Sequence, residues 1–133
     1  MPRLHILVAD DHVFLTELLR HKLVIAGHAV EVVSDGMEAL ERARSGLFDV
    51  VVLDGLMPKM DGFEVLRRLK ADPPDPEPAV VMLTALQGEN DIVGALRMGA
   101  ADYLAKPFIP EELIARIERI GVMATATRHA KRA

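Results

Sequence analysis

Short hydrophobic runs alternate along the chain with longer segments in which hydrophobic residues recur every three or four positions. The short runs are typical of β-strands and lie at 4–9, 28–33, 48–53, 79–83 and 101–104. The longer segments have helical spacing and lie at 13–26, 37–46, 63–69, 88–98 and 110–120. Five such β-α units predict an α/β domain in which one parallel sheet carries helices on both faces.

The pattern also predicts a single domain. The run 48–53 is almost continuously hydrophobic, as in a strand that is buried on both faces of a parallel sheet. The proline-rich segment 72–78 resembles a linker, but the strand at 79–83 needs the earlier strands to bury it, so the segment is interpreted as a surface connection. Asp35 and Asp61 are expected to cap the helices that follow them, and Gly27 to end the first helix.

Composition narrows the class of protein. Hydrophobic residues make up 50% of the 133 residues and charged residues 27%, which predicts a soluble globular domain. The net charge of -4 gives no general attraction to nucleic acid or to anionic lipid. There are no cysteines, which excludes thiolate metal sites. No signal peptide or membrane span is evident, so a cytoplasmic location is expected.

Polar side chains follow four of the predicted strands, at the point where each strand ends. They are Asp10, Asp11, Asp54, Thr84 and Lys106. Because the carboxyl ends of parallel strands meet at one edge of a sheet, these side chains are expected to lie together. Three crowded carboxylates repel one another, so the cluster predicts a bound divalent cation.

The same five residues suit phosphoryl transfer. A carboxylate can attack phosphorus, while a cation, an ammonium group and a hydroxyl balance the negative charge of the transferred group. Taken singly, each residue has a simpler interpretation. Asp10 and Asp11 alone are more often a helix-capping pair, Asp54 or Thr84 a turn residue, and Lys106 a solvated loop lysine. The conjunction of all five favours the chemical interpretation.

The chain resembles the receiver domain of two-component response regulators, over residues 4 to about 120. The resemblance rests on Asp10-Asp11, the segment 54–62, Thr84-Ala85 and Lys106-Pro107-Phe108, in this order and each after a strand. It implies a flavodoxin-like (βα)5 fold with strand order 2-1-3-4-5. It also implies a cis peptide bond between Lys106 and Pro107.

The resemblance implies a role for each site residue. Asp54 would accept a phosphoryl group from a histidine kinase or phosphotransfer protein. Asp10, Asp11, Asp54 and the carbonyl of Leu56 would hold Mg²⁺, or Mn²⁺ in its place, with Asp11 binding the ion directly and Asp10 mainly through water. Lys106 and Thr84 would contact the phosphoryl group, and Tyr103 would rotate inward as Thr84 moves. Such a protein is a phosphoacceptor that assists its own phosphorylation and dephosphorylation, not an enzyme in the usual sense.

Some residues depart from the family pattern or stay outside it. Leu56 and Leu86 are apolar where family members often carry polar groups, and we expect them to slow hydrolysis of the phosphoryl group. The five histidines show no paired metal spacing and are interpreted as structural or solvated. They are His5, His12, His21, His28 and His129.

The sequence also gives expectations for the bounds of the domain and for the partners to which it passes the signal. Residues 1–121 are expected to form the receiver and residues 122–133 a basic tail that either extends the last helix or frays. An effector protein would bind the face made by residues 88–120, and a phosphorylation-dependent dimer is compatible with this; nucleic-acid and membrane partners are not expected. Three alternatives stay open: a module of a longer regulator, an aspartyl-nucleophile phosphatase, and a scaffold that is never phosphorylated.

Overall fold

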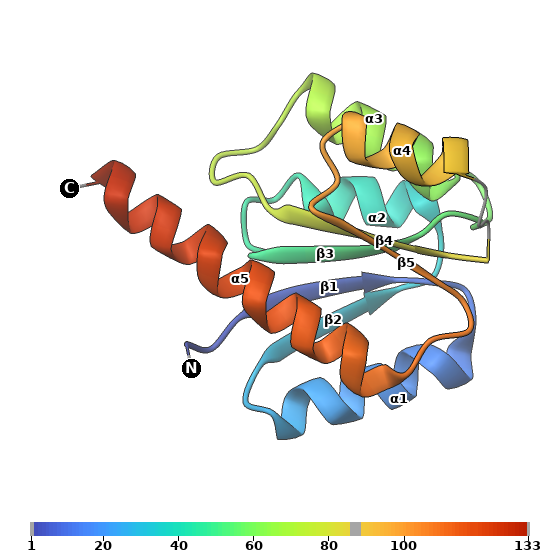
Figure 1. Ribbon diagram of the computed structural model, residues 1–133, viewed down its shortest axis with the longest axis horizontal. Helices are drawn as coiled ribbons and strands as arrows, with labels where there is room; N and C mark the ends of the chain where they lie inside the picture. The colour runs from blue at the N-terminus through green and yellow to red at the C-terminus, as the bar shows by residue number, and fades with distance from the viewer. Residues whose placement is uncertain (1, 86–88, 133) are drawn as a thin grey trace.

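The computed structural model describes residues 2–85 and 89–132, with side chains for 2–85 and 91–127. Five strands form one parallel sheet in the order β2-β1-β3-β4-β5 (Figure 1). The elements are β1 (His5–Ala9), α1 (Val13–Ile25), β2 (Ala29–Val33), α2 (Gly36–Ala43), β3 (Val50–Asp54), α3 (Gly62–Ala71), β4 (Ala79–Thr84), α4 (Glu89–Arg97), β5 (Asp102–Ala105) and α5 (Pro110–Arg132). The predicted fold and strand order are confirmed.

Helices cover both faces of the sheet and bury a core on each. On one face, α2, α3 and α4 lie against the sheet, and on the other face lie α1 and α5 (Figure 1). Strand β3 supplies both cores, because Val51 points toward the first and Val52 toward the second. All five residues of β3 are buried, as its continuous hydrophobic sequence predicts for a central parallel strand.

The element boundaries follow local sequence signals. The Asp35 carboxylate accepts a hydrogen bond from Glu38 N at 2.8 Å and caps α2. Asp61 caps α3 in the same way through Glu64 N. Gly27 follows α1 with a φ of 102°, a conformation that favours glycine. These three predictions are confirmed. Strand β5 begins one residue later than predicted, at Asp102, which pairs with Val81 of β4.

Helix α5 is 23 residues long and continues to Arg132, through the segment for which the sequence left two outcomes open. Its first half packs Leu113 and Ile117 against the sheet, and its second half extends past the sheet (Figure 1). Within the described residues, no helix combines the length and the hydrophobicity that crossing a membrane requires.

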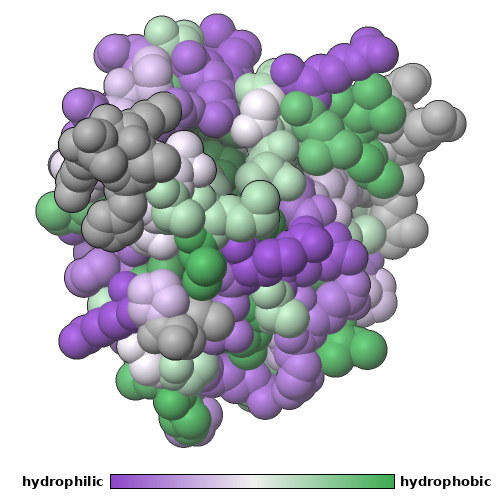
Figure 2. Space-filling view, turned by 60° about the vertical axis from the view of Figure 1, so that its left-hand side comes forward, coloured by the Kyte–Doolittle hydropathy of each residue, from purple (hydrophilic) through white to green (hydrophobic). Residues whose placement is uncertain are grey.

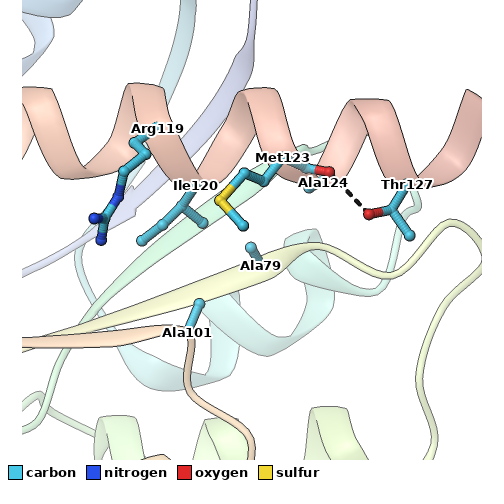
Figure 3. A pocket seen from close by; sticks show the side chains of 7 residues that line it. All are labelled: Ala79, Ala101, Arg119, Ile120, Met123, Ala124 and Thr127. Carbon is cyan, nitrogen blue, oxygen red and sulfur yellow. Dashed lines mark hydrogen bonds between the residues drawn. The ribbon is translucent and has the colours of Figure 1, made fainter.

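A groove of about 470 Å³ lies beside the second half of α5. Its lining comes from α5, from the start of β4 and from the residue before β5, and consists of Ala79, Ala101, Arg119, Ile120, Met123, Ala124 and Thr127 (Figure 3). In the space-filling view, hydrophobic and hydrophilic residues are interspersed over the surface that faces the viewer (Figure 2). The groove is lined mostly by apolar residues and lies at the amino ends of the strands, opposite the edge where the carboxylates gather.

Candidate functional site

The structure brings the five predicted site residues to one edge of the sheet. Asp10 follows β1, Asp54 is the last residue of β3, and Thr84 is the last residue of β4. All three are almost completely buried, with exposed fractions of 1%, 2% and 0%. Asp11 is exposed beside them, and Lys106 follows β5. Buried carboxylates need polar partners, and the site supplies them.

Lys106 supplies a positive charge between the two buried carboxylates. Its Nζ donates to Asp10 Oδ2 at 2.7 Å and to Asp54 Oδ2 at 3.3 Å. The backbone amide of Lys106 also donates to the carbonyl of Thr84 at 2.8 Å, which fixes the start of the loop after β5. The Lys106-Pro107 peptide bond is cis, as the family resemblance predicts.

The two buried carboxyl groups differ in acidity. Burial raises the pKa of Asp10, but hydrogen bonds from Lys106 and from His12 outweigh burial and leave that pKa below its ordinary value. For Asp54, burial and the neighbouring charge of Asp10 prevail over Lys106, and the pKa lies above its ordinary value. A negative charge on Asp54 is therefore the less favourable of the two, and added positive charge would stabilise it.

One histidine, His12, also lies at this site, where the sequence did not place it, and its side chain is 63% exposed. Its Nδ1 lies 2.6 Å from Asp10 Oδ1 and 3.5 Å from Asp11 Oδ1. One ligand atom from each of Asp10, Asp11, His12 and Asp54 falls within 4.8 Å of the others, so these residues form a group that fits a metal ion. The signal in the sequence was the position of His12, directly after the acid pair.

Thr84 and Tyr103 lie on neighbouring strands. Tyr103 pairs with Met82 in the sheet, and its ring is buried in the core beneath α4. Burial and the charge of Asp91 raise the pKa of Tyr103 above its ordinary value. A Cβ added to Gly55 would lie 2.8 Å from Thr84 Oγ1, so only glycine lets the loop after β3 pass this close to Thr84.

Leu56 reaches the site through its backbone. Its amide lies 3.3 Å from Asp54 Oδ1 and donates to that carboxylate, while the residue as a whole is 54% exposed. Leu86 and the side chain of His129 lie outside the described part of the chain. His28 is buried: its Nδ1 accepts from Leu4 N at 3.1 Å and its Nε2 lies 2.8 Å from Glu118 Oε2, which agrees with a structural role.

Comparison with known proteins decides the family. A protein-family model described as the response regulator receiver domain matches residues 6–118. The chain belongs to this family. Receiver domains are parts of two-component signalling systems, and the acidic cluster at the carboxyl edge of the sheet is compatible with the Mg²⁺ binding of such domains.

The relatives of this receiver domain include complete regulators and single domains. The response regulator MprA of Mycobacterium ulcerans is 44% identical over 115 residues, which are 86% of this chain and 49% of MprA. The chain thus spans about half the length of the curated relatives that it matches. The receiver domain of the Francisella response regulator 1452 superposes with a TM-score of 0.85 at 32% identity, over 91% of this chain and 98% of that domain.

A further structural relative is a receiver domain that holds a metal. The receiver domain of the sensor histidine kinase PA1611 of Pseudomonas aeruginosa superposes with a TM-score of 0.78 at 28% identity. The superposition covers 90% of this chain and 98% of that domain, whose structure has a magnesium ion coordinated in its active-site cleft.

Proposed function

We propose that Asp54 accepts a phosphoryl group from a histidine kinase or a phosphotransfer protein, and that the phosphorylated receiver relays the signal by changing its binding surface. The observation that carries this proposal is the placement of Asp54. Its carboxylate is buried at the end of β3, 3.3 Å from the Lys106 ammonium, and beside the carboxylate of Asp10. This arrangement suits a carboxylate that becomes an acyl phosphate.

Each residue of the site has its own role in phosphoryl transfer. An Asp54 carboxylate oxygen attacks phosphorus and a new O–P bond forms. The bond from phosphorus to the donor nitrogen breaks, its electron pair stays on that nitrogen, and the donor leaves as a neutral imidazole that carries its proton on the other ring nitrogen. Lys106 balances charge on the phosphoryl oxygens, and the Thr84 hydroxyl donates to one of them after a small movement. Positioning and charge neutralisation are the main requirements of this chemistry.

We assign a Mg²⁺ site, which Mn²⁺ would also fit, to Asp10, Asp11, Asp54 and the Leu56 carbonyl. Carboxylate and carbonyl oxygens are the ligands that these ions prefer. The fit rests on the gathering of the ligand atoms and on the raised pKa of Asp54, because a cation would relieve its repulsion with Asp10. When bound, the ion supplies positive charge to the phosphoryl oxygens.

Two surfaces serve the proposed partners. Exposed hydrophobic side chains at Val13, Phe14 and Ile109 lie at the start of α1 and just before α5, next to the site, and suit the docking of a phosphodonor protein. We assign effector binding and phosphorylation-dependent dimerisation to the face of residues 88–120, which includes Tyr103 on the strand beside that of Thr84. Residues 1–121 would act as the receiver, with 122–133 as a helical extension.

Incubation with acetyl phosphate and Mg²⁺ tests the proposal. A gain of one phosphoryl group in the intact mass is expected for the natural protein, and no gain for Asp54→Asn. An equal gain in both proteins would place the phosphoryl group elsewhere. No gain at any Mg²⁺ concentration would favour a scaffold that is never phosphorylated.

The same preparation tests the phosphatase alternative. An aspartyl-nucleophile phosphatase of the common type has a second aspartate two residues after the nucleophile, and this position is Leu56 here. Steady turnover of a free phosphomonoester would revive that function, whereas a single stable phosphorylation supports the receiver function.

A further inference from the structure

We propose that His12 is an additional metal ligand, and that its Nδ1 shifts the preference of the cation site from Mg²⁺ toward divalent transition ions such as Ni²⁺. The inference rests on the proposed metal site of Asp10, Asp11 and Asp54, and it extends that site by a nitrogen donor.

The orientation of His12 is the first observation. His12 is the residue that precedes α1, a position where a polar side chain normally caps the helix, but its ring makes no capping hydrogen bond. The ring instead turns toward the acids, with Nδ1 2.6 Å from Asp10 Oδ1, 3.5 Å from Asp11 Oδ1 and 3.8 Å from Asp54 Oδ2. One atom of His12 thus faces all three carboxylates.

The distances fit a shared ion. Ligand atoms about 2.1 Å from an octahedral ion lie about 3.0 Å apart when adjacent and about 4.2 Å apart when opposite. The three distances from His12 Nδ1, between 2.6 and 3.8 Å, require changes of only a few tenths of an ångström to reach the adjacent or opposite spacing. The ring is 63% exposed, so it can adjust without disturbing the core.

The chemistry of the donor decides the selectivity. Imidazole nitrogen suits Zn²⁺, Cu²⁺, Fe²⁺ and Ni²⁺, whereas Mg²⁺ prefers oxygen ligands and retains several waters. In the metal-free site Nδ1 forms a hydrogen bond with Asp10 Oδ1 at 2.6 Å. To bind the ion, Nδ1 gives up this hydrogen bond and offers its lone pair, with the ring proton on Nε2. Lys106 Nζ lies 3.2 Å from Nδ1 and 2.7 Å from Asp10 Oδ2, so the carboxylates already attract one positive charge to this place. A bound ion would repel the ammonium group, which would then move toward the phosphoryl position.

Metal titration by calorimetry at constant pH, on tag-free protein that has been stripped with a chelator, tests the inference. Mg²⁺ and Ni²⁺ are each titrated into the natural protein and into His12→Ala. We expect His12→Ala to weaken Ni²⁺ binding about tenfold or more and to change Mg²⁺ binding less than about twofold. The visible spectrum of bound Co²⁺ should change in the same variant, because one nitrogen ligand is lost.

Two further variants complete the design. His21→Ala removes an exposed histidine of α1 and should leave both affinities unchanged. Asp11→Asn should weaken both ions, because it removes a shared oxygen ligand. If His12→Ala changes both affinities by the same factor, changes neither, or strengthens both because the ring competes with the ion, the inference is wrong. Failure of the natural protein to bind Mg²⁺ would instead contradict the metal site in the proposed function.

Discussion

The Lys106 ammonium lies closer to Asp10 than to Asp54: Nζ is 2.7 Å from Asp10 Oδ2 and 3.3 Å from Asp54 Oδ2. The lysine therefore screens the repulsion between the two buried carboxylates. It lies nearer to Asp10, the carboxylate that we do not expect to react. A phosphoryl group on Asp54 would offer Lys106 a more negative partner, and this links the charge balance of the site to its signalling state.

Removal of Lys106 should destabilise the metal-free protein. Lys106→Met leaves Asp10 and Asp54 without their shared cation, and we expect the free energy of unfolding at neutral pH to fall by about 1–3 kcal/mol. Urea unfolding in the presence of a chelator measures this change. Lys70→Met is the matched control, since its pair with the exposed Glu77 should contribute less than about 1 kcal/mol. Equal effects of the two substitutions would contradict the screening role.

Neutralisation of Asp54 should stabilise the metal-free protein. Burial and the charge of Asp10 raise the pKa of Asp54 above 3.8, so ionisation of this carboxyl group opposes folding. The stabilisation by Asp54→Asn should be absent below pH 3.8, should grow as the pH rises through the folded-state pKa, and should stay constant above it. Thermal unfolding across this pH range measures it, and a lower melting temperature of Asp54→Asn at pH 7 would contradict the account.

Glu64 should contribute to acid sensitivity in the opposite sense. Hydrogen bonds from Arg67 and Arg68 lower the pKa of Glu64 from 4.5 to about 2. A depressed pKa stabilises the folded state above 4.5, and this stabilisation is lost as the pH falls from 4.5 toward 2. Glu64→Gln should therefore flatten the melting temperature over this interval. Glu17→Gln is the matched control, because it also removes an exposed glutamate that faces an arginine, here Arg20 at 3.5 Å.

Two glycines should respond to alanine in opposite directions. A Cβ on Gly62 would lie 2.1 Å from the backbone oxygen of Asp54, so Gly62→Ala must displace the loop that holds the acceptor. We expect a loss of about 2 kcal/mol or more in the free energy of unfolding and slower phosphorylation by acetyl phosphate. Gly94 in α4 has open space around it, and Gly94→Ala should stabilise by about 0.5–1 kcal/mol. Similar effects of the two substitutions would contradict this argument.

The sequence predicted the meeting of Asp10, Asp54, Thr84 and Lys106 because parallel strands align their carboxyl ends, and strand periodicity is visible in the hydrophobic pattern. The place of His12 was not predictable in this way. Its ring direction depends on the loop before α1 and on Lys106, which lies 94 residues away along the chain.

The hydrophobic pattern of the sequence also could not predict distances within the site. Periodicity assigns Tyr103 to a strand, but its burial beneath α4 depends on how α4 and β5 pack together. In the same way, the sequence places Lys106 near both acids but does not say which one it contacts more closely. Tertiary packing decides both points.

Localisation of the phosphoryl group tests the central claim most directly. The protein is treated with acetyl phosphate and Mg²⁺, the acyl phosphate is reduced with borohydride, and the modified residue is identified by peptide mass spectrometry. The account predicts reduction at Asp54 alone, with none at Asp10 or Asp11, and no reduced product in Asp54→Asn. Reduction at Asp10 or Asp11 in place of Asp54 would contradict it.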